Sequence, residues 1–178
     1  MIADAFAHCE DVRTVLDAPC GVGRATIWLA ENEYAVTGID LGEGALNLAA
    51  RLLAGKGLSA RLEKRDLFAT GLPERSYDAV LCFRLIHHFD SRSLQQQLVK
   101  ELCRLSDGYV VISRITPWSW TSMRRRVRRL ISGTPIKQYP VARRDLNVWF
   151  ASHGFREVAR LGRFPLLHSL QVQVYERE

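Results

Sequence analysis

One stretch, residues 14–24 with the sequence T-V-L-D-A-P-C-G-V-G-R, constrains the fold of this chain more than any other. Its β-branched and apolar start ends at a carboxylate, Asp17, and two glycines, Gly21 and Gly23, precede a helix-forming segment. This order predicts a strand, a sharp turn and a helix. Because glycine has no Cβ and the first turn of a helix presents free N–H groups, such a turn suits a ligand of the nucleotide type.

The acid at the end of this strand narrows the choice of ligand. In dinucleotide-binding folds a glycine-rich turn holds a pyrophosphate at the helix N-terminus, and the carboxylate of Asp17 would repel it. The region after the fourth predicted strand also lacks a Tyr-x-x-x-Lys pair, so an NAD-dependent oxidoreductase is disfavoured. A cofactor that has no phosphate and carries sulfonium and ammonium cations fits an acidic strand end better.

The turn resembles the first motif of the class I S-adenosylmethionine-dependent methyltransferases, in which D-x-G-x-G-x-G follows an apolar strand. Asp17, Gly21 and Gly23 match this motif, whereas Pro19 replaces its first glycine. Cys20 fits the D-x-x-C-G-x-G variants of the superfamily. The resemblance implies that Asp17, Cys20, Gly21 and Gly23 contact S-adenosylmethionine.

Strands and helices are predicted to alternate along nearly the whole chain. Strands are expected at 13–17, 35–40, 59–64, 77–83, 108–115, 156–161 and 170–175, and helices at 2–9, 25–33, 43–54, 91–106 and 145–152. This rhythm predicts right-handed crossovers and a parallel sheet. The resemblance implies a single α/β domain, residues 1–178, with a Rossmann-like, doubly wound, seven-stranded and mostly parallel sheet. Its last strand is antiparallel, and helices cover both faces.

Two further acids are expected beside the first motif, at the carboxyl edge of the sheet. Asp40 closes the second predicted strand 17 positions beyond Gly23, close to the spacing at which nucleotide-binding folds place a carboxylate for ribose hydroxyls. A helix N-cap or turn residue is the structural alternative for Asp40. By resemblance, Asp66 binds the adenine amino group and Leu67 lines the ring pocket, although a plain loop acid fits the same short pattern.

The end of the fourth predicted strand, F-R-L-I-H-H at 83–88, resembles the motif that faces the cofactor's methyl group. Phe83 and Arg84 are therefore expected at the methionine moiety. In a helix His87 and His88 would point about 100° apart, so at most one faces the site. His88 is the candidate general base, by resemblance and because histidine titrates near neutrality. The alternative is a histidine that satisfies backbone groups at the strand–helix junction.

A basic segment at 117–140 interrupts the rhythm of strands and helices. Five arginines fall within Arg124–Arg129, opposite a predicted apolar helical stripe. Such an insertion fits a solvated face of a packed lid, an anionic acceptor or peripheral membrane contact. Nucleic acid is disfavoured because no aromatic and basic stacking pattern accompanies the arginines. The formal net charge of +6 makes an acidic partner worth considering without requiring one.

Length and composition fit one globular domain, with 178 residues of which 47% are hydrophobic. The first residues lack a basic start, and no stretch approaches the roughly 18 apolar residues of a membrane span, so a cytoplasmic protein is expected. The four cysteines form no C-x-x-C pair, and no metal is expected.

The leading hypothesis is methyl transfer from S-adenosylmethionine to a small-molecule or lipid-like acceptor, by in-line attack on the sulfonium methyl. The short segment before the first predicted strand and the missing acceptor motif leave room for an alternative. In that case the chain is a non-catalytic S-adenosylmethionine-binding partner or regulatory subunit.

Overall fold

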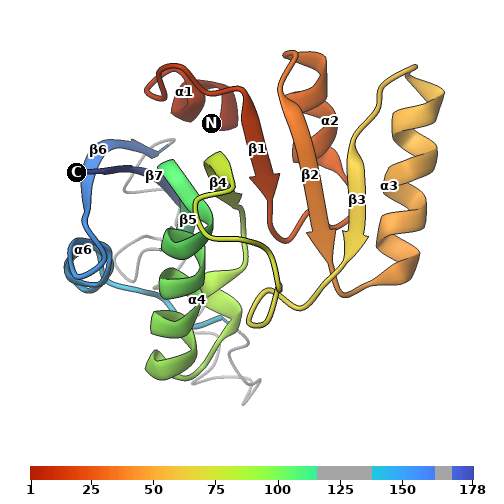
Figure 1. The fold of residues 1–178 in the computed structure, drawn as a ribbon. Coiled ribbons are helices and arrows are strands. Elements are labelled where there is room, and N and C mark those ends of the chain that lie inside the picture. The colour runs from red at the N-terminus through yellow and green to blue at the C-terminus, as the bar shows by residue number, and fades with distance from the viewer. Residues whose placement is uncertain (116–137, 163–169) are drawn as a thin grey trace.

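A computed structural model of the chain describes residues 1–115, 138–162 and 170–178. Seven strands form one sheet in the order β3-β2-β1-β4-β5-β7-β6 (Figure 1). The strands are β1 (Thr14–Asp17), β2 (Ala35–Asp40), β3 (Arg61–Lys64), β4 (Tyr77–Cys82), β5 (Ser106–Ile115), β6 (Phe155–Gly162) and β7 (Leu170–Arg177). Neighbouring strands from β3 to β5 run parallel, and β7 runs antiparallel to β5 and β6. The predicted fold class is confirmed.

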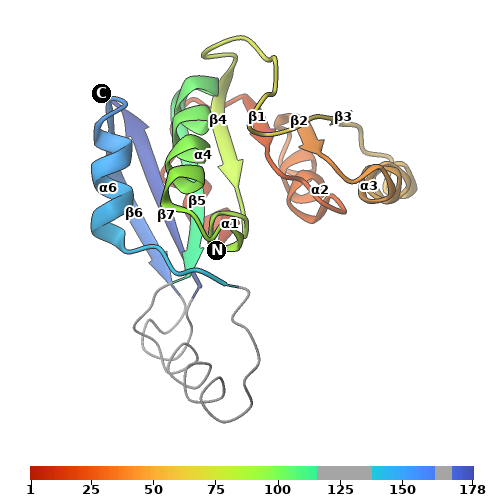
Figure 2. The same ribbon diagram turned by 90° about the horizontal axis from the view of Figure 1, so that it is seen from below.

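Helices lie on both faces of the sheet (Figure 2). They are α1 (Ile2–Phe6), α2 (Arg24–Glu31), α3 (Glu43–Gly55), α4 (Arg92–Leu105), α6 (Arg143–Ala151) and a 3-10 turn, η1 (Ile86–His88). Buried residues of α4 and α6 join one hydrophobic cluster with the sheet, and those of α1 and α2 join a second cluster on the other face. Helix α3 packs against β2 and β3.

The middle parts of β1, β4 and β5 are apolar on both sides because both faces are covered. Val15 of β1 and Val111 of β5 belong to the cluster under α1 and α2, whereas Leu16 and Val110 belong to the cluster under α4 and α6. This alternation follows from the two-residue period of a strand. It explains why the strand sequences read as nearly continuous apolar runs.

The parallel register brings the acidic strand ends to one edge of the sheet. Asp17 pairs with Gly38 of β2 on one side and with Leu81 of β4 on the other. Asp40, at the end of β2, pairs with Lys64 at the end of β3. The carboxyl ends of four adjacent strands therefore form the frame of one site.

Several predicted boundaries were wrong by a few residues. Helix α1 ends at Phe6, and β3 begins at Arg61. Strand β5 begins at Ser106 because Ser106 pairs with Tyr77 before the register shifts at a bulge. Helix α2 ends at Glu31, two residues before Glu33 takes a left-handed backbone with φ of +65°.

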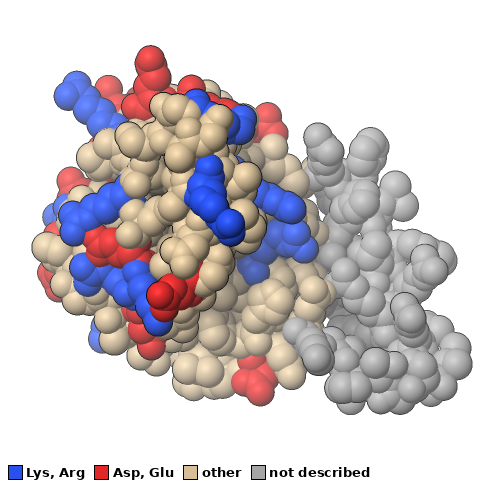
Figure 3. Space-filling view, turned by 90° about the vertical axis from the view of Figure 1, so that its right-hand side faces the viewer, with Lys and Arg blue, Asp and Glu red and all other residues tan. Residues whose placement is uncertain are grey.

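Most of the predicted basic insertion, including Arg124–Arg129, lies outside the described residues. On the edge of the molecule formed by β3 and α3, side chains of both charge signs are interspersed (Figure 3). Lys64 contacts Glu43 there at 3.2 Å, so the charges of this face are partly paired. Within the described ranges, the helices are too short or too polar to cross a bilayer.

Candidate cofactor site

The turn after β1 brings together the first motif. The buried Asp17 ends the strand, and its Oδ2 accepts a hydrogen bond of 2.6 Å from Thr26 Oγ1 in α2. Gly23 caps α2 with φ of +79°, and a Cβ added there would lie 2.8 Å from Ala49 Cβ. Glycine is needed at this position both for the backbone conformation and for the close approach of α3.

The carboxyl group of Asp17 has a raised pKa. Burial raises the pKa of its carboxyl group to about 7, which outweighs the lowering effect of the Thr26 hydrogen bond. Its Oδ1 is buried and has no hydrogen-bond partner among the described residues. A cation placed beside the turn would favour the carboxylate form, so the site has an acid whose ionisation responds to ligand charge.

Asp40 links the first two strand ends. Its Oδ2 accepts the Gly21 N–H at 2.9 Å and its Oδ1 accepts the Gly42 N–H at 2.7 Å. Each carboxylate oxygen can accept more than one hydrogen bond, so both retain capacity for ribose hydroxyls. Asp40 therefore shapes the turn and also presents acceptor oxygens beside it. Its turn contacts match the structural alternative as well as the binding prediction.

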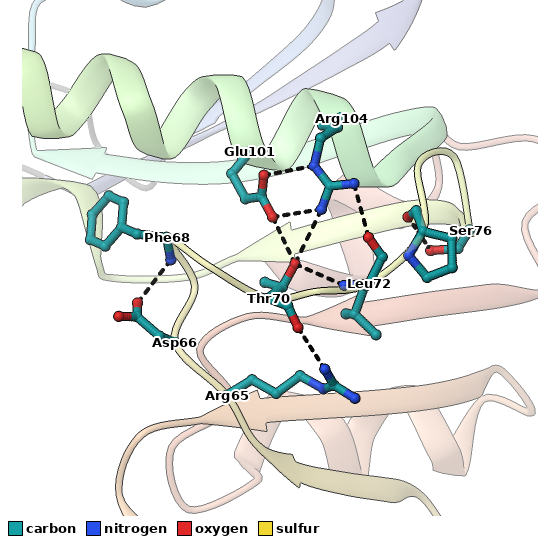
Figure 4. Close-up of polar contacts among 9 residues, drawn as sticks. Arg65, Asp66, Phe68, Thr70, Leu72, Ser76, Glu101 and Arg104 are labelled. Atoms are coloured by element: carbon teal, nitrogen blue, oxygen red, sulfur yellow. Dashed lines mark hydrogen bonds and ion pairs between the residues drawn. The ribbon is translucent and has the colours of Figure 1, made fainter.

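The segment after β3 is the third contributor. Arg65 donates its N–H to Asp40 O at 3.1 Å, which attaches this segment to the end of β2. The next residue, Asp66, is exposed, and its Oδ1 accepts the Phe68 N–H at 2.9 Å (Figure 4). Leu67 is buried in the cluster under α4. An exposed carboxylate beside an apolar residue is suited to an aromatic base with an amino group.

The end of β4 is the fourth contributor. Arg84 has an exposed side chain and a left-handed backbone with φ of +64°, which is unusual for a residue with a side chain. Its N–H donates to Ser113 Oγ of β5 at 2.5 Å, and this contact helps to hold the conformation. Phe83 is half-buried just before it. The strained residue lies where the methionine end of the cofactor is expected.

The two histidines of η1 have different environments. His87 is buried, whereas His88 is exposed, and their ring centroids are 4.6 Å apart. The Tyr139 N–H donates to His87 O at 2.7 Å. Exposure leaves His88 able to meet an acceptor, and its role as a base stays a prediction.

Cys20 has a packing role at the base of the turn. Its Sγ and Cβ lie 3.1 Å from the position of a Cβ added at Gly38 of β2. Burial raises the pKa of the Cys20 thiol to about 12, so it stays protonated near neutrality. Within 1–115, 138–162 and 170–178, the structure contains no group of three or more side chains suited to a metal ion.

Sequence reasoning missed three residues of the site. Thr26 bonds to Asp17, and Ser113 bonds to the Arg84 backbone. Leu41 follows Asp40 with 63% of its surface exposed, so it offers an apolar surface beside a carboxylate. Leu41 could have been proposed from the sequence, because it is an isolated leucine directly after Asp40. The other two contacts depend on tertiary structure.

The fold and these strand ends define a class of protein, the class I S-adenosylmethionine-dependent methyltransferases. A family model described as "Methyltransferase domain" matches residues 15–107, which is more than half of the chain. The chain therefore belongs to the methyltransferase-domain family, and the resemblance inferred from its motifs is confirmed.

Individual relatives agree with this placement. The ubiquinone biosynthesis O-methyltransferase of Nitrosospira multiformis is 32% identical over 104 residues, which cover 58% of this chain and 43% of that protein. The chain thus spans less than half the length of this curated relative. Magnesium protoporphyrin IX methyltransferase from Synechocystis PCC 6803 with bound SAH has the same fold, with a TM-score of 0.82 at 19% identity, covering 99% of this chain and 78% of that one. A SAM-dependent methyltransferase from Methanosarcina mazei also has this fold, with a TM-score of 0.80 at 18% identity. The match covers 96% of this chain and 95% of that one.

Proposed function

We propose that the chain binds S-adenosylmethionine and transfers its methyl group to a small-molecule or lipid-like acceptor. The observation that carries this proposal is the convergence of four strand ends at one edge of the sheet. Asp17 would lie beside the sulfonium and ammonium charges, and Asp40 would accept hydrogen bonds from the ribose hydroxyls. Asp66 and Leu67 would contact the adenine. The remaining cofactor contacts are assigned to Cys20, Gly21, Gly23, Phe83 and Arg84.

For methyl transfer, the protein mainly has to position the cofactor and the acceptor. The sulfonium makes the methyl group electrophilic, so aligning the acceptor with the departing sulfur and excluding water supply most of the effect. A general base is optional, and His88 is the candidate because it follows Phe83 and Arg84 and is exposed. The names of the relatives support a small-molecule acceptor in this chain as well.

Calorimetric titration with S-adenosylmethionine and S-adenosylhomocysteine tests the cofactor site. Asp40→Ala should weaken binding by roughly 1–3 kcal/mol, because a carboxylate that accepts hydrogen bonds from the ribose is lost. Asp107→Ala is the matched control, since Asp107 is an exposed acid at the opposite end of the sheet. Unchanged affinity in Asp40→Ala would contradict the assignment of Asp40.

The alternative is a non-catalytic S-adenosylmethionine-binding partner, and one observation favours testing it. The chain spans 43% of the Nitrosospira relative, so the match does not extend to the whole of that methyltransferase. Calorimetric binding without methyl transfer to any acceptor, in the presence of candidate partner proteins, would support this alternative. Transfer of radioactive methyl groups by the isolated chain would exclude it.

A further inference from the structure

Arg114, near the carboxyl end of β5, is a buried cation that has no carboxylate partner in the part of the chain that the structure describes. It is 4% exposed, and its three nitrogens donate to neutral acceptors. Nε bonds to Gln173 Oε1 at 2.8 Å, Nη1 to Val141 O at 2.8 Å and Nη2 to Gln171 Oε1 at 2.6 Å. Among the described residues, no carboxylate oxygen lies within 4.0 Å of the guanidinium.

The acidic residues near Arg114 do not supply the missing negative charge through a direct contact. The segments 116–137 and 163–169, which flank Arg114 and Gln171 along the chain, contain no aspartate or glutamate. Glu157 acts on Arg114 through space, but it is already paired with Arg143 at 2.8 Å. Burying a guanidinium costs several kcal/mol unless an opposite charge compensates it, so the arrangement is incomplete electrostatically.

Unused donors accompany this charge. A guanidinium has five N–H groups, and the three hydrogen bonds to described residues leave one on each of Nη1 and Nη2. Gln173 Nε2 is buried and has no partner among the described residues. Two terminal N–H groups are the set that an oxyanion with two oxygens accepts side by side.

The position of Arg114 relates this cation to the proposed reaction. Ser113, the preceding residue, holds the Arg84 N–H at the end of β4. The segment that supplies Val141 O also bonds to η1, because the Tyr139 N–H donates to His87 O. Arg114 is thus one strand away from the residues expected at the methyl group, and it bonds to the segment whose Tyr139 contacts the His87 carbonyl.

We infer that Arg114, with the amide of Gln173, is the receptor for an oxyanion group of the methyl acceptor, most simply a carboxylate. This inference rests on the proposed function and specifies its acceptor as an anion. The cofactor is bound elsewhere, by the turn after β1 and the neighbouring strand ends, so acceptor anion and cofactor should bind together.

The direct test uses the Nε–Hε NMR signal of Arg114 in the wild-type chain, identified by its absence in Arg114→Lys. Acetate, inorganic phosphate and chloride are titrated at constant ionic strength, with and without saturating S-adenosylhomocysteine. A saturable shift with acetate that persists when S-adenosylhomocysteine is bound supports the inference. A stronger response to phosphate would assign the oxyanion to a phosphate group instead.

Thermal denaturation in acetate against chloride provides the variant test. Acetate should raise the Tm of the wild type and of Arg51→Gln, which removes an exposed arginine of α3, but not that of Arg114→Gln. An unresponsive Arg114 signal, or competition between acetate and S-adenosylhomocysteine, would overturn the inference even if Arg114→Gln failed to fold. Absence of S-adenosylhomocysteine binding would instead count against the proposed function.

Discussion

At the residue scale, the two glycines of the turn after β1 should differ in what they tolerate. Gly23→Ala should lower the free energy of unfolding by about 2–5 kcal/mol. The new methyl group would overpack against Ala49, and alanine would also have to adopt the unfavourable left-handed backbone with φ of +79°. Gly21→Ala is the matched control, since nothing lies within 4 Å of its added Cβ and only the cost of φ +53° remains, about 1–2 kcal/mol. Urea denaturation measures both, and equal losses would contradict the account of the α2–α3 contact.

The raised pKa of Asp17 predicts a pH dependence of cofactor binding. With a pKa of about 7, the group is largely protonated at pH 6 in the free protein and ionised at pH 8. The sulfonium of S-adenosylmethionine favours the carboxylate, so binding below pH 7 must release a proton and affinity should rise about tenfold from pH 6 to pH 8.

Calorimetry in buffers of different ionisation enthalpy measures this proton release. S-adenosylhomocysteine is the control ligand, because it lacks the sulfonium charge and should show a weaker dependence on pH. If both ligands show the same pH dependence, or if the pH dependence persists in Asp17→Asn, then ionisation of Asp17 is not its cause.

Much of the candidate site could be predicted at the residue scale, because its acids follow apolar runs. Asp17 and Asp40 each close a strand that the sequence indicates, and both lie at the predicted edge of the sheet. The hydrogen bond from Gly21 to Asp40 spans 19 positions, and the one from Arg84 to Ser113 spans 29. Neither leaves a local pattern, since both depend on strands that become neighbours only in the sheet.

At the element scale, helix α4 braces the segment that follows β3 (Figure 4). Thr70 Oγ1 donates to Glu101 Oε1 at 2.7 Å, and Arg104 Nη1 donates to Leu72 O at 2.9 Å. Arg104 also bonds to both oxygens of Glu101, and the Arg104 hydrogen bond lowers the pKa of that carboxyl. The same segment contains Asp66, so α4 should help to position the proposed adenine contact.

Loss of this brace should weaken cofactor binding. Glu101→Gln removes the charge that Arg104 and Thr70 contact, and we expect S-adenosylhomocysteine affinity to fall about tenfold, as for one charged hydrogen bond. Glu31→Gln removes an acid from an exposed pair with Lys56 and should change affinity by less than about twofold. Calorimetry on both variants makes the comparison, and matching affinities would show that α4 does not position this segment.

The identity of the elements could be predicted better than their ends. Apolar runs and helical spacing located β1, β2, β4 and α4, because burial on one or both faces leaves its period in the sequence. The two extra residues at the start of β5 could not be predicted, since Ser106 and Asp107 are polar and join the strand through pairing with β4.

At the scale of the whole molecule, the sheet should be most stable at its centre. Strands β1, β4 and β5 have paired neighbours on both sides and helices over both faces, whereas β3 and β6 are edge strands. Hydrogen exchange followed by mass spectrometry should therefore show the slowest amides in β1, β4 and β5 and faster amides in β3 and β6. Exchange in β3 as slow as in β4 would contradict this order.

The parallel half of the topology could be predicted from the alternation of strands and helices, because crossovers of one hand leave few arrangements. The family resemblance predicted that the last strand is antiparallel, but the placement of β7 between β5 and β6 was not predicted. Short strands near the end of a chain form a hairpin equally well in either order along the sheet edge. The antiparallel pairing of β7 with both neighbours resolves this point.

The contact between Gly23 and Ala49 has a consequence for how such a chain can diverge. The two residues are 26 positions apart, yet the room available at one is set by the other. If a larger side chain replaces Ala49 during evolution, α3 must lie farther out or the turn before α2 must change. The size of residue 49 and the shape of the turn should therefore change together among descendants, so that ligand choice can drift through a helix residue outside the turn.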